Sequence, residues 1–209
     1  IKNLDGFGLN LDLFVNISAN DEGFFDTFLY LELEEKIKKC NIFKNIYITH
    51  SDNCGMDIGG FFMSYCKMLT MGLRYHQIIK IHSKTNKKWR YAMLYSILGS
   101  DKIVANNLKL MANVENGMIG HDKIPVSSVY NVNKKSYKDL QEYLNFFKVK
   151  NDNLGYFIPG TIFWVKGEIF DNFLTKENIL NFYNDFEPNY CGDLKNLNKE
   201  GKPHAFERL

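Results

Sequence analysis

The chain has 209 residues, of which 45% are hydrophobic and 15% aromatic, and its formal net charge is +2. This composition is typical of a globular protein, and the length suits one domain with a full core. The nearly neutral charge gives no argument for a nucleic-acid partner. Because no apolar run reaches the roughly 18 residues of a transmembrane helix, we also expect no membrane span.

The predicted elements alternate along the chain, which favours an α/β fold with a central, mostly parallel sheet flanked by helices. Strands are predicted at 11–19, 45–49, 77–82, 118–120 and 162–165. Helices are predicted at 24–39, 58–72, 89–98, 101–113, 137–147 and 168–174, with Ser100 or Asp101 as a cap. Irregular segments are expected at 121–136 and 184–203. Neither a GxGxxG fingerprint nor a GxxxxGK[ST] loop is present, which argues against a dinucleotide dehydrogenase and a P-loop NTPase.

The cysteines indicate a reducing compartment. None of the four, Cys40, Cys54, Cys66 and Cys191, lies in a CxxC pair, so we expect free thiols. The predicted location is therefore the cytoplasm, and the host cytoplasm if the protein is viral. The chain begins at Ile1 and ends in what resembles the start of a helix, so we interpret residues 1–209 as one domain of a longer chain.

The loop after the second predicted strand is the first candidate site. It contains Asp52 and Asn53, whose side chains can bond sugar hydroxyls, and Gly55, which permits close backbone approach. Asp57 follows at the start of the next helix. Ligands with phosphates often dock where the carboxyl end of a strand meets a helix N-terminus. The alternative is a turn capped by Asp57 that binds no ligand.

The end of the third predicted strand is the second candidate site. Lys80, His82 and Lys84 lie there within five positions. Cations at a strand end suit a diphosphate because ionised donors bond phosphate oxygens strongly. His82 could also be a metal ligand. The alternative is a solvated basic loop.

Two later segments carry further candidates. A Pro-Gly turn leads into an aromatic strand that contains Thr161 and Trp164, which could form a wall against a sugar. The alternative for this strand is ordinary core, where aromatic residues are common. The C-terminal segment contains Asp193, Glu200 and Glu207, any of which could act as a general base, and His204, which could join a metal. The alternative there is a solvated tail.

Taken together, these segments resemble the rhamnan synthesis protein F family. The segment 53–59 resembles the motif N-x-G-x-D-I-G, 79–85 resembles K-I-H-[ST]-K, 160–165 resembles G-[ST]-M-F-W-[VF], and 204–208 resembles H-A-[LIF]-E-R. The pairs and triplets at 89–90, 98–100 and 118–120 follow in the same order as in the family. The resemblance covers about residues 12 to 208, and several short motifs in order are more specific than any one of them.

The resemblance implies a GT-A-like glycosyltransferase of surface polysaccharide or capsid glycan synthesis. Such an enzyme would move rhamnose or a hexose from a UDP- or TDP-sugar donor to a glycan acceptor. By analogy with such enzymes, we expect the transfer to invert the configuration at the anomeric carbon. Donor and acceptor contacts would come from Asp52, Asn53, Gly55, Asp57, Lys80, His82, Lys84, Thr161 and Trp164. The base would be Asp193, Glu200 or Glu207. The alternatives are a non-catalytic nucleotide- or glycan-binding module, and a nucleotidyltransferase.

The sequence departs from the GT-A pattern at the position of the metal. These enzymes usually carry a D-x-D acidic motif that holds Mn²⁺ or Mg²⁺ on the diphosphate, and here the place reads His82-Ser83-Lys84. A cation must still meet the charge that develops on the leaving diphosphate. Either Lys84 supplies it directly, or His82, with His204 as a possible partner, holds a Mn²⁺ or Mg²⁺ cofactor.

Overall fold

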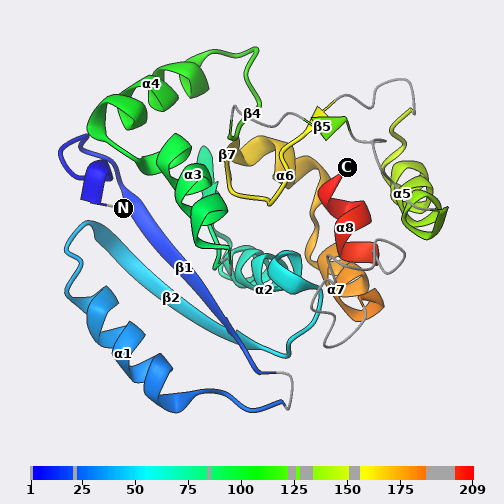
Figure 1. The fold of residues 1–209 in the computed structure, drawn as a ribbon, viewed down its shortest axis with the longest axis horizontal. Coiled ribbons are helices and arrows are strands. Elements are labelled where there is room, and N and C mark those ends of the chain that lie inside the picture. Colours follow the sequence, from blue (N-terminus) through cyan, green and yellow to red (C-terminus); the bar gives the residue numbers. More distant parts are fainter. Residues whose placement is uncertain are drawn as a thin grey trace.

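The computed structural model describes residues 2–20, 23–83, 86–121, 126–127, 134–150, 156–186 and 201–209. Figure 1 shows the arrangement of the elements. The strands are β1 (Leu11–Ser18), β2 (Phe43–Ser51), β3 (Gln77–Lys80), β4 (Met118–Ile119), β5 (Val126–Ser127), β6 (Tyr156–Phe157) and β7 (Phe163–Lys166). The helices are η1 (Lys2–Leu4, a 3-10 turn), α1 (Thr27–Lys38), α2 (Met56–Thr70), α3 (Lys87–Leu98), α4 (Asp101–Ala112), α5 (Lys134–Phe147), α6 (Gly167–Phe173), α7 (Lys176–Asp185) and α8 (Lys202–Glu207).

The predicted mixed α/β class is confirmed, but the described strands do not form one central parallel sheet. β1 and β2 pair in parallel over their whole lengths. β7 instead lies between β3 and β4 and is antiparallel to both, with Trp164 opposite Ile79 and Ile119. The short strands β5 and β6 form a third, antiparallel pair. The difference arises because β3 and β7 are joined by a long connection, and a periodic apolar pattern marks a strand without giving its direction.

The helix boundaries follow from local side chains. Asn86, Ser100 and Thr175 each accept a hydrogen bond from a backbone N–H three residues on, and so cap α3, α4 and α7. Ser100 is thus the cap of α4, as the sequence allows. The helix α7 and the strand pair β5–β6 are not among the predicted elements. Within the described ranges, no helix combines the length and the hydropathy that crossing a bilayer requires.

Helix α2 lies at the centre of the molecule, in cyan in Figure 1. It packs against β1 and β2 on one side and against α7 and α8 on the other. Phe62 on α2 is fully buried and contacts the rings of Phe182, Phe186 and Phe206. A second core cluster, which includes Met93, Ile97, Val104 and Trp164, lies under α3, α4 and β7. Three segments meet between these two core clusters. They are the N-terminus of α2, the end of β3 and the turn before β7.

Candidate functional site

A buried ion pair joins the start of α2 to the end of β3. The Nζ atom of Lys80 lies 2.6 Å from Oδ2 of Asp57, and Lys80 is only 5% exposed. The same ammonium donates to the carbonyl oxygen of Thr161 at 3.0 Å and to its hydroxyl oxygen at 2.8 Å. The Thr161 hydroxyl in turn donates to the Asp57 carboxylate. Asp57, Lys80, His82 and Thr161 are called the polar centre below.

His82 lies between two backbone carbonyl oxygens in this centre. Its Nε2 lies 2.7 Å from the carbonyl oxygen of Gly160, and its Nδ1 lies 2.8 Å from the carbonyl oxygen of Ser83. A carbonyl oxygen can only accept a hydrogen bond, so each of these contacts suits a ring nitrogen that carries a proton. Nε2 also lies 3.5 Å from Oδ2 of Asp57. Lys80 and His82 therefore both lie against the Asp57 carboxylate.

The groups around Asp57 keep its carboxyl ionised. Burial alone would raise the pKa of the Asp57 carboxyl, but the charges of Lys80 and His82 and the hydrogen bonds from Lys80 and Thr161 hold that pKa well below its usual range. Asp57 is thus ionised at physiological pH and already engaged by several donors. It is suited to hold the centre together and not to exchange a proton with a substrate.

The backbone takes left-handed conformations on both sides of the polar centre, two of them at residues other than glycine. Gly55 and Met56 have φ angles of 69° and 54°, and Gly160 and Thr161 have φ angles of 82° and 48°. A left-handed conformation is unusual for a β-branched residue such as Thr161 and costs about 1–3 kcal/mol. Its hydrogen bonds to Lys80 and Asp57 hold it there. Such strain gathers at ligand sites, which marks these two loops as candidates.

The C-terminal helix packs onto the same turn. The Glu207 side chain on α8 accepts a hydrogen bond from the Gly160 N–H, with an N···O distance of 2.5 Å. The guanidinium of Arg208 lies 4.9 Å from the centroid of the Phe157 ring. Arg208 as a whole is 7% exposed. The predicted candidate base Glu207 is therefore brought next to the polar centre through Gly160.

The other predicted site residues fall in three groups. Asp52 and Asn53 lie in the loop before α2, where the Asp52 carbonyl accepts from Tyr183 at 3.3 Å. Gly55, and not Asp57, takes the cap position of α2, so the alternative in which Asp57 caps this helix is wrong. His204 lies on α8. Lys84, Asp193 and Glu200 are outside the described residues, and their predicted roles stay predictions.

Trp164 lies inside the molecule. It is 2% exposed and belongs to the second core cluster, together with Ile97 and Val104. A direct contact between its indole and a sugar would require that cluster to open. Trp164 lies on β7, three residues after Thr161.

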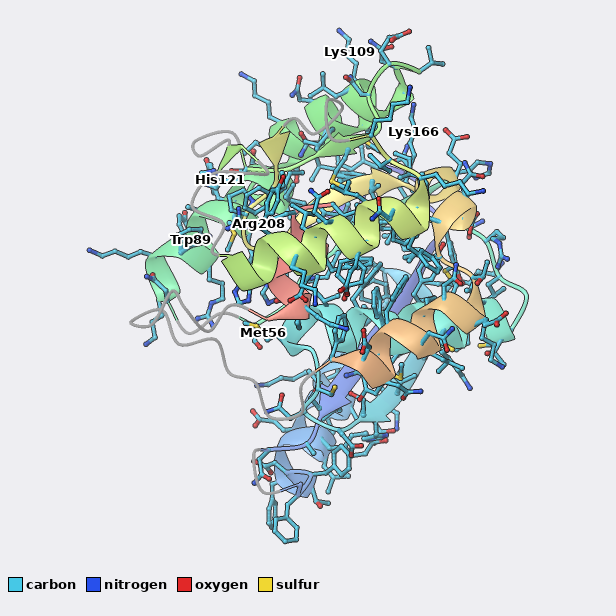
Figure 2. The ribbon with its side chains drawn as sticks, turned by 90° about the vertical axis from the view of Figure 1, so that its right-hand side faces the viewer. Met56, Trp89, Lys109, His121, Lys166 and Arg208 are labelled. Atoms are coloured by element: carbon cyan, nitrogen blue, oxygen red, sulfur yellow. The ribbon has the colours of Figure 1, made fainter. Side chains whose placement is uncertain are left out.

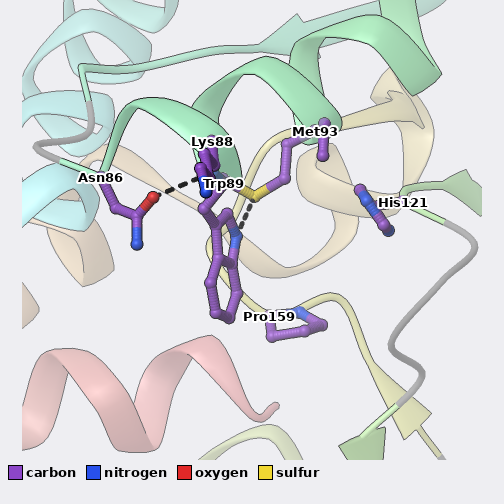
Figure 3. A pocket seen from close by; sticks show the side chains of 7 residues that line it. Asn86, Lys88, Trp89, Met93, His121 and Pro159 are labelled. Atoms are coloured by element: carbon purple, nitrogen blue, oxygen red, sulfur yellow. Dashed lines mark hydrogen bonds between the residues drawn. The ribbon is translucent and has the colours of Figure 1, made fainter.

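A cleft that the sequence did not assign opens next to the polar centre. It encloses about 260 Å³ and is lined by Asn86, Lys88, Trp89, Ala92, Met93, His121 and Pro159 (Figure 3). Figure 2 shows Trp89 and His121 on one side of the molecule, and Lys109 and Lys166 toward its upper end. In the sequence, Trp89 belongs only to the pair 89–90 of the resemblance, and His121 is not among the predicted site residues. The signal that could have located this cleft is a tryptophan in the first turn of the helix that follows the second candidate site.

The predicted metal ligand His82 does not fit that role as it is bonded here. A metal ligand offers a lone pair, and both nitrogens of His82 face carbonyl oxygens. Asp57 likewise shares its carboxylate with Lys80, His82 and Thr161. In the arrangement described here these groups are engaged by protein partners, and a metal at His82 or His204 stays a prediction.

The chain was also compared with known proteins. Neither the models of protein families, nor the curated proteins, nor the solved structures give a match to it.

Proposed function

We propose that this chain is a GT-A-like glycosyltransferase that transfers a sugar, rhamnose or a hexose, from a UDP- or TDP-sugar to a glycan hydroxyl. The product would be a surface polysaccharide or a capsid glycan. One observation carries the proposal. The segments that resemble the rhamnan synthesis protein F family contact one another at Asp57, Lys80, His82, Thr161 and Glu207. The hydrogen-bonded pairs among them are separated by 23 to 104 positions in the sequence.

The polar centre supports this chemistry through its charge. The leaving nucleoside diphosphate gains negative charge as the glycosidic bond breaks, and a preorganised cation stabilises it. In the proposed mechanism, Lys80 positions the loops because its ammonium is bonded to Asp57 and Thr161. His82 supplies an imidazolium at the turn, and Lys84 supplies a second cation by its place in the motif. The parallel pair β1–β2, whose end leads into α2, supports the GT-A-like assignment.

Inversion requires a carboxylate that deprotonates the acceptor hydroxyl. Among the described residues, Glu207 is the predicted base that lies against the polar centre, since it bonds the Gly160 N–H. We therefore propose Glu207 ahead of Asp193 and Glu200 for this role. Its hydrogen bond to Gly160 would orient the carboxylate toward the turn that carries Thr161.

The test of the proposed function is a titration with UDP- and TDP-sugars by calorimetry, followed by chromatography of each mixture. We expect one donor class to bind and to release free nucleoside diphosphate slowly when no acceptor is present. Binding without hydrolysis, and without transfer to added glycans, would favour the non-catalytic binding module. Release of pyrophosphate from a nucleoside triphosphate would instead indicate a nucleotidyltransferase.

The charge that we propose for His82 predicts that UDP binding does not require a metal ion. His82→Gln keeps a hydrogen-bond donor but loses the charge, so UDP affinity should fall about tenfold, or about 1.4 kcal/mol. Chelation with EDTA should change the affinity of the unmodified protein by less than about threefold on the same scale. Isothermal titration calorimetry measures both quantities.

The matched control is His76→Gln. His76 lies just before β3, at the opposite end of that strand from the polar centre, and its replacement should leave UDP affinity unchanged. The prediction fails if EDTA abolishes UDP binding and Mn²⁺ restores it, because a metal would then supply the charge that we assign to His82.

A further inference from the structure

The cleft beside the polar centre has the size of a single ring. It lies between the first turns of α3 and the turn that precedes β7, and it encloses about 260 Å³. Sites for larger ligands enclose roughly 300–1,000 Å³. A whole sugar nucleotide therefore exceeds this cleft, whereas one ring of a larger ligand fits it. Its walls are mainly the indole of Trp89, the thioether of Met93 and the ring of Pro159 (Figure 3).

The indole of Trp89 contacts Met93 and remains open to solvent. Its indole N–H donates to the sulfur of Met93 at 2.7 Å, and its backbone N–H donates to Oδ1 of Asn86 at 3.1 Å. The residue is nevertheless 40% exposed, whereas Trp164 is 2% exposed. An aromatic surface that is fixed before binding loses little conformational entropy when a ring stacks on it. Trp89 thus offers a preorganised stacking surface.

Polar groups stand at the rim of this surface. Asn86, Lys88 and His121 line the cleft together with the apolar side chains. A pyranose has an apolar face that can cover an indole and an edge of hydroxyls that bond such amide, ammonium and imidazole groups. The rim and the stacking surface therefore match the two parts of a sugar ring.

The position of the cleft distinguishes an acceptor sugar from a nucleobase. Pro159 lines the cleft, and the next residue, Gly160, accepts the hydrogen bond of His82 in the polar centre. An acceptor ring must touch the transferred sugar, whereas a base is separated from the diphosphate by a ribose. We propose that the Trp89 cleft binds one pyranose ring of the glycan acceptor, stacked on the indole. This inference rests on the proposed function for the identity of the neighbouring donor.

Tryptophan fluorescence tests the inference directly because Trp89 is the exposed one of the two tryptophans in the chain. The probes are methyl α-L-rhamnopyranoside, methyl β-D-glucopyranoside and methyl β-D-galactopyranoside. At least one should change the emission saturably with millimolar affinity, which corresponds to about −4 kcal/mol. In Trp89→Ala, saturation-transfer NMR should show about tenfold weaker binding of that glycoside.

Two variants control for folding and for nonspecific contact. Trp89→Phe keeps a ring in the cleft and should retain most of the affinity, and circular dichroism checks that both Trp89 variants are folded. Tyr91 lies on the same helix, is 68% exposed and stacks on Tyr95, and it does not line the cleft. Tyr91→Ala should therefore bind the glycoside like the unmodified protein.

A parallel titration with UDP separates this inference from the proposed function. A saturable response to UDP and to none of the glycosides would overturn the acceptor assignment and make the cleft a base site, while the proposed function would stand. If glycoside binding depends on Trp89 and no nucleotide binds, the cleft is a sugar site as inferred, but the proposed glycosyltransferase function is wrong. Glycoside binding that Trp89→Ala leaves unchanged, or no response to any probe, would also overturn the inference.

Discussion

Replacing Asp57 with asparagine should lower the free energy of unfolding by about 3–5 kcal/mol, because it leaves a buried ammonium without its counter-charge. Lys80 is 5% exposed and its Nζ lies 2.6 Å from the Asp57 carboxylate. The amide of asparagine can still accept a hydrogen bond, but it carries no charge to offset the desolvation of Lys80. Urea denaturation followed by circular dichroism measures the loss.

A double-mutant cycle with Lys80→Met is the control. The Nζ of Lys80 lies 5.8 Å from the ring centroids of Phe61 and Phe163, so a methionine at this position has apolar neighbours. We expect Asp57→Asn with Lys80→Met to recover at least about 1 kcal/mol relative to the sum of the single variants. Additive effects, or a loss below about 1 kcal/mol for Asp57→Asn, would show that the pair is not buried and coupled as described.

The same carboxylate sets a pH dependence with a definite sign. The pKa of Asp57 is depressed in the folded state, so its contribution to stability is present above the unfolded pKa of about 3.9 and is lost as pH falls through the folded pKa. Denaturation at several pH values should therefore show that the stability gap between the unmodified protein and Asp57→Asn narrows as pH falls below about 4. A gap that widens on acidification would contradict this sign.

The sequence predicted the elements whose pattern is local. Strand and helix periodicity located β1, β2, α2 and α3 to within a few residues, and Ser100 was a recognisable cap. The direction of β7 was not predictable, since it depends on how the turn at Gly160 and Thr161 meets β3 across about eighty positions of sequence. Helix α7 was missed although Thr175 supplies its cap.

The candidate site was likewise predictable only in part. Residue type and position at strand ends indicated Asp57, Lys80 and His82 as functional. The bond between Asp57 and Lys80 depends on how the start of α2 meets the end of β3, so the sequence assigned Lys80 to a ligand and did not show this bond. Trp164 stands in the apolar run 162–165 and Trp89 lies between Lys88 and Arg90, so the local sequence already indicates which tryptophan is buried and which is exposed.

Gly59→Ala should destabilise the protein by about 3 kcal/mol, because an added Cβ would overlap a backbone atom. That Cβ would lie 1.8 Å from the carbonyl oxygen of Cys54, and the Gly59 N–H already donates to the Gly55 carbonyl at 2.9 Å. The loop that precedes α2 would have to move. The better helix propensity of alanine offsets only about 1 kcal/mol of this cost. Thermal or urea denaturation measures the effect.

Gly60→Ala is the matched control at the next position of the same helix. Its Cβ would lie 3.1 Å from Nδ2 of Asn16, the end of a side chain that can shift by a few tenths of an ångström. The gain in helix propensity should then make Gly60→Ala neutral or stabilising by up to about 1 kcal/mol. If both variants lose the same free energy of unfolding, the cost comes from placing alanine in this part of α2 and not from the overlap with Cys54.

The Gly59 variant also links the fold to the site. The displaced loop contains Cys54 and Gly55 and leads directly to Asp57, so its movement shifts the carboxylate that Lys80, His82 and Thr161 share. At a temperature where Gly59→Ala is still folded, UDP affinity should therefore fall, whereas Gly60→Ala should bind UDP normally. If Gly59→Ala loses stability but binds UDP as tightly as the unmodified protein, the nucleotide does not depend on the geometry of Asp57. The polar centre would then be a structural ion pair beside the site and not part of it.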